Sequence, residues 1–505
     1  MVCEREEARC WYDEFMQSPL SRFVLNDVEV DLSAPAVPSG LTVLDFVRQR
    51  RRLTGTKEGC KEGDCGACVV LVGTLDGAGV RYAPMTSCMM PVAEVIGRHV
   101  VTIEGLAVEP MNTVQREIVA AGASQCGFCT PGIVVSLVGR LMDGEAPASD
   151  GERIPHEVDR ALSGHLCRCT GYRSLRQATS TAFEALEKAQ GVEGLVATGE
   201  LPAYFLEIPE RLRALAKEHD GLAAATGKTV VAGGTDLYVQ RGEELPAQEI
   251  VSLGATRPEL GGVELDGRQI RIGALATFED LATSSLLLDR LPAIGPWMDL
   301  IASWQIRTRS TVGGNLINAS PIGDVTVLML ALGAEAVLEE GVGVRRSLPL
   351  EDLYLGYKQL DLRPGEILVG VRVPDLGEHD HAGFEKVSKR RWLDIATVNS
   401  ASRLRLEDGV VAEARLAAGG VAPVPLFLRE SSALLVGREL DVETLRRVLD
   451  AVQDEIAPIS DVRGSADYKR RLVHNLLIAQ LTTLFPGSFA LDSTYQAFFG
   501  PRLAS

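Results

Sequence analysis

The stretch Cys60-Lys61-Glu62-Gly63-Asp64-Cys65-Gly66-Ala67-Cys68 decides how this chain is interpreted, together with Cys88 further along. Three cysteines separated by four and then two residues, with a distant fourth, have the spacing of a plant-type [2Fe–2S] site. A loop that supplies three thiolates to two irons has to wrap tightly, and Gly59, Gly63 and Gly66 alternate with the cysteines. The sequence therefore predicts an iron–sulfur cluster here.

A second group of four cysteines follows in the same part of the chain. It reads Gln125-Cys126-Gly127-Phe128-Cys129 and, later, Cys167-Arg168-Cys169. Each pair precedes a segment with helical periodicity, and the partial positive charge of a helix N-terminus favours thiolate ligands. We interpret this group as a second [2Fe–2S] site, held in a small helical bundle.

Two other uses of eight cysteines have to be weighed. Four disulfides suit a small secreted chain, whereas this one has 505 residues and no apolar segment near Met1. Zinc is the stronger alternative for the second group, since two cysteine pairs are common in zinc sites. A C-x-C pair is tighter than the usual zinc knuckle, so iron–sulfur is favoured there and zinc stays open.

Composition narrows the class of protein further. Apolar residues make up 46% and charged residues 24%, as in ordinary globular proteins, and the length predicts several domains. A formal charge of −17 argues against a nucleic-acid or anionic-membrane partner. No apolar run reaches the length of a membrane span, so we expect a cytoplasmic protein, with Cys3 and Cys10 as free thiols.

Periodicity gives the expected elements. A short hairpin over residues 22–32 and a helix over 41–53 precede the first cysteine loop, and strands follow it. Helices are predicted from Asn112 onward, one of them capped by Thr130 with Pro131 at its first position. Residues 190–202 have the composition of a linker, and alternating strands and helices come after it.

Two segments beyond the linker contain paired glycines. The first is Thr229-Val230-Val231-Ala232-Gly233-Gly234-Thr235-Asp236-Leu237, and the second runs from Ser310 to Asp324 around Gly313-Gly314. Paired glycines let backbone N–H groups approach a bulky anion, although such a pair after a strand is often only a turn. Beside two redox sites, these two loops favour a redox cofactor that carries phosphate. The seven histidines show no metal or hydrolase spacing.

The cysteine groups, the paired glycines and the segment from Gly356 to Leu368 resemble the xanthine dehydrogenase family of molybdenum hydroxylases. More narrowly, the chain is similar to the small iron–sulfur/FAD subunit of bacterial two-chain members. The resemblance implies a multidomain α+β fold. Its parts are a β-grasp ferredoxin-like domain (21–105), a helical [2Fe–2S] domain (106–190), a two-subdomain α/β FAD-binding domain (203–378) and a C-terminal α+β domain (382–490).

The resemblance also implies site residues. One cluster would take Cys60, Cys65, Cys68 and Cys88, and the other Cys126, Cys129, Cys167 and Cys169. Gln125 would reach the pterin of a partner's molybdenum cofactor. FAD would be contacted by Val230, Val231, Ala232, Gly233, Gly234, Thr235, Asp236, Leu237, Thr311, Gly314, Asn315, Ser320, Asp324, Leu368 and Lys386, with Tyr357 near the nicotinamide. Ile301 stands where some members place a Phe against the flavin, which leaves the choice between NAD+ and oxygen open.

The implied function is electron transfer. No molybdopterin-binding domain fits in this length, so a large partner subunit would oxidise purine, in a heterotetramer of two small and two large chains. Electrons would then pass through both clusters and FAD to NAD+. The alternatives are the equivalent subunit of an aldehyde, aromatic acyl-CoA or N-heterocycle hydroxylase and, more distantly, a non-catalytic zinc-binding assembly protein.

Overall fold

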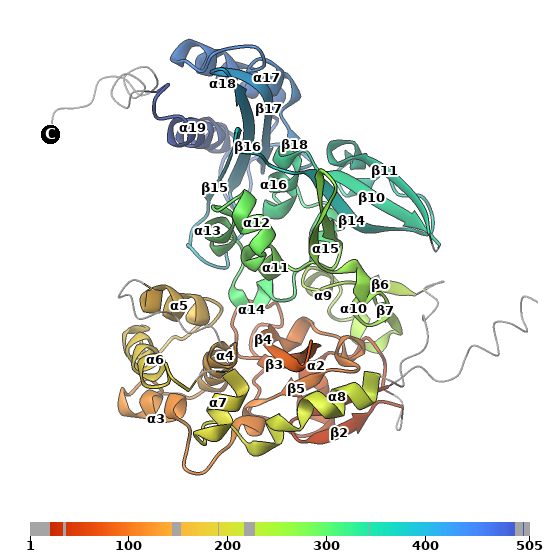
Figure 1. Ribbon diagram of the computed structural model, residues 1–505, viewed down its shortest axis with the longest axis vertical. Helices are drawn as coiled ribbons and strands as arrows, with labels where there is room; N and C mark the ends of the chain where they lie inside the picture. Colours follow the sequence, from red (N-terminus) through yellow and green to blue (C-terminus); the bar gives the residue numbers. More distant parts are fainter. Residues whose placement is uncertain are drawn as a thin grey trace, which may run out of the picture. The chain divides into compact units, whose positions relative to one another are not determined.

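The structure is a computed structural model that describes residues 21–33, 37–143, 153–189, 191–216, 228–341 and 343–489, and Phe498 (Figure 1). Cys3 and Cys10 lie outside these residues. The chain forms two compact units: one runs up to Pro258 and also contains Ser303–Arg309, and the other comprises Glu259–Ala302 and the residues from Ser310 onward. The expected multidomain α+β fold is confirmed.

The first unit begins with a five-stranded sheet in the order β2-β1-β5-β3-β4, in which only β1 and β5 are parallel. The predicted hairpin turns at Asn26, which adopts a φ of 53°. The apolar residues on one face of the hairpin, such as Phe23 and Val30, pack into a core with helical residues such as Phe46. The strands are β1 (Arg22–Leu25), β2 (Val28–Asp31), β3 (Val69–Asp76), β4 (Gly79–Thr86) and β5 (His99–Val101).

The helix predicted over 41–53 is shorter than expected, and its second part is a π-helix, which is wider than an α-helix. It consists of α2 (Val43–Asp45), capped by the Thr42 side chain, and a π-helical turn, η1 (Phe46–Arg50). The turn presents Phe46 and Val47 to the core and Arg50 to solvent.

Around the second cysteine group, the described residues form a bundle of helices, in which α4 (Thr130–Met142) packs against β3 and β4 (Figure 1). Asn112 caps α3 by accepting a hydrogen bond from the Gln115 N–H at 3.0 Å. The predicted cap at Thr130 is wrong, because α4 already includes Thr130, whose hydroxyl bonds Ser124 instead. The helices are α3 (Thr113–Ala120), α4 (Thr130–Met142), α5 (Arg153–Leu162), α6 (Arg173–Ala185) and α7 (Gly191–Ala197).

The segment predicted as a linker is folded. Helix α7 occupies its first half, and Leu195 and Leu201 are buried in the core of the helical bundle. Burial of these two leucines outweighs the glycines that suggested a flexible connection. The first unit is completed by α8 (Ile208–Ala216), the parallel strands β6 (Thr229–Val231) and β7 (Ile250–Ser252), and the short helices α9 (Leu237–Gln240), α10 (Leu253–Thr256) and α14 (Trp304–Arg307).

The second unit contains two antiparallel sheets, in the orders β11-β10-β14-β9-β8 and β15-β16-β17-β18. Helix α16 (Asp324–Leu332) contacts β14, β16 and β17, and α19 (Ala466–Leu484) packs on β15 and β16 (Figure 1). The strands are β8 (Val263–Asp266), β9 (Gln269–Gly273), β10 (Glu335–Glu340), β11 (Val344–Pro349), β14 (Glu366–Pro374), β15 (Asp380–Val387), β16 (Val398–Glu407), β17 (Val410–Gly419) and β18 (Leu426–Phe427), with a small pair β12 (Tyr354–Gly356) and β13 (Gln359–Leu360).

The remaining helices of this unit precede its glycine pair, contain it, or follow the strands of the second sheet in the sequence. They are α11 (Phe278–Thr283), α12 (Ser285–Arg290), α13 (Ile294–Asp299), α15 (Val312–Asn318), α17 (Arg429–Ala433) and α18 (Val442–Glu455).

Candidate functional site

The first cysteine group lies on the loop between η1 and β3, with Cys88 on the short 3-10 turn η2 (Ser87–Met89). The thiols approach each other in two pairs, Cys60 with Cys65 and Cys68 with Cys88. The pKa of Cys60 is lowered to about 5, because Cys65 hydrogen-bonds to it and backbone N–H groups point at it, that of Glu62 at 3.3 Å. Such N–H donors stabilise a thiolate.

Glycines shape this loop where it bends most sharply. Gly63 and Gly66 have φ of 80° and 69°, which a residue with a side chain rarely adopts. Gly59 is required because of a close contact: a Cβ there would lie 2.6 Å from the Cys65 sulfur.

The second group is divided between the start of α4 and the turn before α6. Here too the thiols are paired, Cys126 with Cys169 and Cys129 with Cys167. Cys126 and Cys169 are exposed, whereas Cys129 is buried. Gln125 is exposed beside them, and its side-chain N–H donates to the Cys169 carbonyl at 3.4 Å.

The donor chemistry of both groups suits a binuclear iron cluster. Each group offers two pairs of thiols, and a [2Fe–2S] cluster takes two thiolates on each iron. Among the residues that the structure describes, no three His, Cys, Asp or Glu side chains are grouped so as to hold one metal ion. The two pairs of thiols in each group are what fits a cluster, and the assignment of each cysteine as a ligand stays a prediction.

The two cysteine loops touch each other through their backbones. The Leu166 N–H, one residue before Cys167, donates to the Cys65 carbonyl at 3.0 Å. A Cβ on Gly66 would lie 2.2 Å from the Gly164 carbonyl oxygen and 2.4 Å from Nδ1 of His165. His165 is fully buried and shares a hydrogen bond with Ser136 of α4 at 2.8 Å. The two candidate clusters are therefore held next to each other by direct contact of their loops.

Replacing Gly66 with Ala is expected to destabilise this junction by roughly 2–4 kcal/mol, because the new Cβ meets backbone atoms and the φ is strained. Thermal unfolding would give the loss of stability, and the absorption of both clusters would fall together. Gly97→Ala is the matched control, since Gly97 has a φ of 71° and nothing within 4 Å. Equal effects in both variants would mean that the contact with Gly164 has no role.

The first glycine pair follows β6 as predicted. Gly234 has a φ of 71°, and a Cβ there would lie 3.1 Å from the carbonyl oxygen of Met89, the residue after Cys88. Val231 and Tyr238, on either side of the turn, belong to the same apolar cluster as Cys68 and Cys88. The expected flavin loop is thus packed against the expected ligands of the first cluster.

The second glycine pair is not a loop, which corrects the prediction. Gly313 and Gly314 form the first turn of α15, and the Thr311 hydroxyl caps it by accepting from the Gly314 N–H at 3.0 Å. Gly313 is needed for packing, because a Cβ would lie 2.7 Å from the Ala274 side chain. Asn315 then accepts hydrogen bonds from the N–H and hydroxyl of Thr326 in α16, at 3.0 and 2.8 Å.

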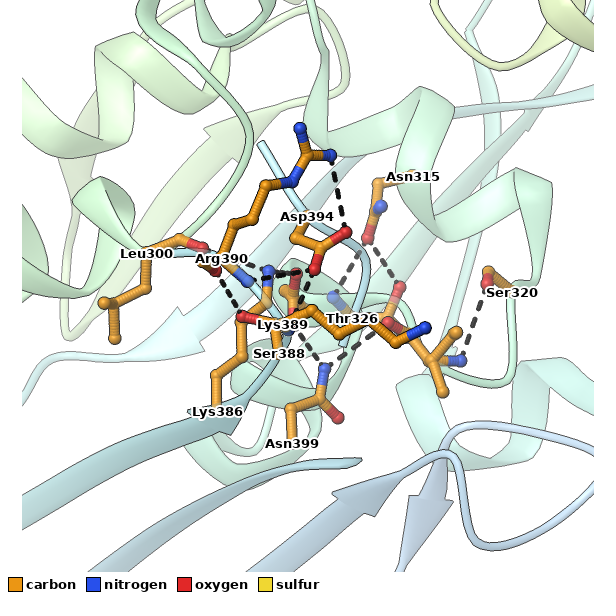
Figure 2. Close-up of polar contacts among 12 residues, drawn as sticks. Leu300, Asn315, Ser320, Thr326, Lys386, Ser388, Lys389, Arg390, Asp394 and Asn399 are labelled. Carbon is orange, nitrogen blue, oxygen red and sulfur yellow. Dashed lines mark hydrogen bonds and ion pairs between the residues drawn. The ribbon is translucent and has the colours of Figure 1, made fainter. Parts of the chain in front are cut away.

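A buried polar network surrounds the N-terminus of α16 (Figure 2). The Lys386 ammonium donates to Asp324 at 2.8 Å and to the Leu300 carbonyl at 3.0 Å, and its side chain is only 2% exposed. Asn399 of β16 donates to the other Asp324 oxygen at 2.5 Å. Asp324 is well placed for an acid at a helix N-terminus. The sequence indicated Lys386 and Asp324 but not Asn399, which looked like an ordinary strand residue.

Replacing Lys386 with Met should lower the thermal midpoint of this unit by roughly 10 °C, because it leaves the Asp324 carboxylate without its cation. Differential scanning calorimetry measures the change. A matched control is Arg446→Met, which breaks the exposed pair with Glu443 and should shift the midpoint little. A midpoint for Lys386→Met close to that of the control would refute a structural role for the pair.

The other predicted residues fall in different environments. Ile301 and Leu368 are buried, Ser320 accepts from the Ile322 N–H at 3.5 Å, and Tyr357 is 64% exposed. The basic run from Lys389 to Arg391 is exposed on a loop in which Asp394 accepts from two backbone N–H groups (Figure 2). The predicted flavin contacts are divided between the two units.

In a comparison with known proteins, four family models match successive parts of the chain. They are the 2Fe-2S iron-sulfur cluster binding domain (27–93), the [2Fe-2S] binding domain (102–180), the FAD binding domain in molybdopterin dehydrogenase (210–376) and the CO dehydrogenase flavoprotein C-terminal domain (384–484). Together these models cover most of the described chain, in the order that the fold shows. The chain belongs to the molybdenum hydroxylase family. It contains two 2Fe-2S domains and an FAD-binding domain.

Individual relatives within the molybdenum hydroxylases are moderately similar. Xanthine dehydrogenase 1 of Arabidopsis thaliana is 28% identical over 85% of this chain, and aldehyde oxidase 1 of Bos taurus is 28% identical over 86%. The chain spans 37% of the length of each. Among solved structures, carbon monoxide dehydrogenase from Hydrogenophaga pseudoflava is 29% identical, with a TM-score of 0.48 over 53% of this chain and 92% of that one. No described helix has the length and apolarity to cross a bilayer.

Proposed function

We propose that the chain is the small, electron-transfer subunit of a xanthine dehydrogenase. A large molybdopterin-binding subunit would oxidise hypoxanthine or xanthine, and NAD+ would be the final acceptor. Two [2Fe–2S] clusters and FAD supply single-electron and hydride chemistry when bound. The similarity to curated xanthine dehydrogenases supports this choice of substrate. Because the proposed acceptor is NAD+, we also propose a cytoplasmic location.

The observation that carries the proposal is the sequence of contacts within the first unit. The exposed pair Cys126 and Cys169 offers a surface through which a partner could deliver electrons. The Leu166–Cys65 hydrogen bond joins this group to the first, and Cys88 is followed by Met89 against Gly234. These contacts support three proposed redox sites in order, from an exposed edge to the proposed flavin loop.

In the proposed function, the side chains of this chain position the cofactors and do not react themselves. Gln125 would face the partner's pterin beside Cys169. The Lys386–Asp324 pair would supply polar groups beside the flavin. Tyr357, which is 64% exposed, would contact a nicotinamide. A heterotetramer of two small and two large subunits is expected.

Purification of the tagged chain with its natural partner tests the proposal. We expect a brown complex with four irons and one FAD per small subunit and NAD+ reduction driven by hypoxanthine. Turnover of an aldehyde or of CO, but not of purines, would move the chain to another branch of the molybdenum hydroxylases. A colourless protein with two zincs and no flavin would instead support a role in assembly.

A further inference from the structure

Arg309 is a fully buried cation at the base of the expected flavin loop. Its side chain is 0% exposed, and it belongs to the first unit together with the loop. The guanidinium donates to Glu94 of η3 (Val92–Val95) at 2.6 Å, to the Gly233 carbonyl at 2.6 Å and to the Thr86 carbonyl at 3.4 Å. A buried guanidinium needs such partners, and here one of them is the glycine pair itself.

The bond to Gly233 sets the direction of the next N–H group. The Gly233 carbonyl and the Gly234 N–H belong to one trans peptide, in which the two groups point in opposite directions. Because the carbonyl faces the buried Arg309, the Gly234 N–H faces away from it. Neither Gly233 nor Gly234 uses its N–H in a hydrogen bond to any residue that the structure describes. Two free N–H groups on a glycine turn suit an anion.

The charges beneath the turn do not cancel. Arg98 also approaches Glu94, at 4.0 Å, so two guanidinium groups share one carboxylate. Within the described part of the chain, no other acidic side chain forms an ion pair with either arginine. Burial lowers the pKa of Arg98; attraction by Glu94 opposes this effect, and repulsion by Arg309 adds to it.

We propose that the buried Arg309, together with Glu94 and the partly exposed Arg98, forms a positive cluster that anchors the diphosphate of FAD through the Gly233–Gly234 peptide, without touching the ligand. This rests on the proposed flavin site. Arg309 is therefore a positioning residue: it orients one peptide and supplies charge in a region of low dielectric, where a unit charge attracts an anion strongly. Neither effect requires contact between the guanidinium and the cofactor.

Titration of the deflavinated full-length protein with FAD and, separately, with riboflavin tests this role. In Arg309→Met the affinity for FAD should fall on the order of tenfold, while riboflavin, which has no phosphate, should bind as in the wild type. Arg309→Lys keeps the charge and should recover part of the FAD affinity. Arg403→Met, which removes a buried arginine paired with Asp380 in the other unit, is the control and should leave both affinities unchanged.

Glu94→Gln separates electrostatics from structure. It breaks the same buried ion pair but increases the net positive charge, so FAD should bind as tightly as in the wild type or more tightly. A loss of FAD affinity in Glu94→Gln equal to that in Arg309→Met, or an equal loss of FAD and riboflavin binding in Arg309→Met, would overturn the proposal. If Arg309→Met does not fold, the FAD affinities of Glu94→Gln and Arg309→Lys still test the proposal. A wild-type protein that binds no FAD would instead refute the flavin site itself.

Discussion

Cys126→Ser is expected to remove one of the two reduced-cluster EPR signals and, with it, purine-driven NAD+ reduction. The serine hydroxyl is a poor replacement for a thiolate on iron, and Cys126 is one member of the exposed pair with Cys169. The signal from the group of Cys60, Cys65, Cys68 and Cys88 should remain. Oxidation of NADH by an artificial acceptor should persist, because the flavin and the first cluster are untouched.

The control for this variant is Cys10→Ser, which changes a cysteine outside both groups and should keep both signals and full turnover. Ser124→Ala, two residues from Cys126, tests whether the loop tolerates a change that spares the thiol; it removes only the hydrogen bond to Thr130. Purine-driven NADH formation near the wild-type rate in Cys126→Ser would show that electrons bypass this group.

Gly234→Val is expected to lower the flavin content of the purified protein to a tenth or less. Two effects combine: a φ of 71° is unfavourable for a β-branched residue, and the new Cβ would lie 3.1 Å from the Met89 carbonyl. The side chain would also cover the free N–H groups of the turn. Flavin absorption relative to iron content measures the loss, and both cluster signals should remain.

Gly77→Val separates the two effects, because Gly77 has a φ of 56° and nothing within 4 Å. This control carries similar backbone strain in the hairpin between β3 and β4, far along the chain from the flavin loop. It should keep its FAD. Flavin content that stays normal in Gly234→Val, or falls equally in Gly77→Val, would remove the glycine pair from the cofactor site.

Much of the fold could be predicted because its signals are local. Alternating apolar residues and Asn26 specify the first hairpin, and Asn112 marks the start of α3. The errors arose where tertiary packing overrides local preference. Burial of Leu195 stabilises a helix in the segment that resembles a linker. Gly313 suggests a turn in the sequence, but it lies inside α15, where it packs closely against Ala274.

The candidate site shows the same division. Cysteine spacing indicates the two groups, since each contains cysteines that are close in sequence: Cys60, Cys65 and Cys68 in the first, and the pairs Cys126–Cys129 and Cys167–Cys169 in the second. The contacts that join the groups to each other and to the flavin loop are long-range: Leu166 to Cys65 and Arg309 to Glu94. Nothing in the residues around Arg309 distinguishes it from an exposed arginine, so its burial could be found only from the structure.

The assignment of Ser303–Arg309 to the first unit has a consequence for any attempt to dissect the molecule. The polypeptide leaves this unit at Pro258, returns for one short passage and leaves again, so no single cut in the chain separates the halves. A fragment that ends at Pro258 would lack Arg309, leaving Glu94 with only the more distant Arg98. Gene fusions and truncations should therefore carry this passage with the iron–sulfur half.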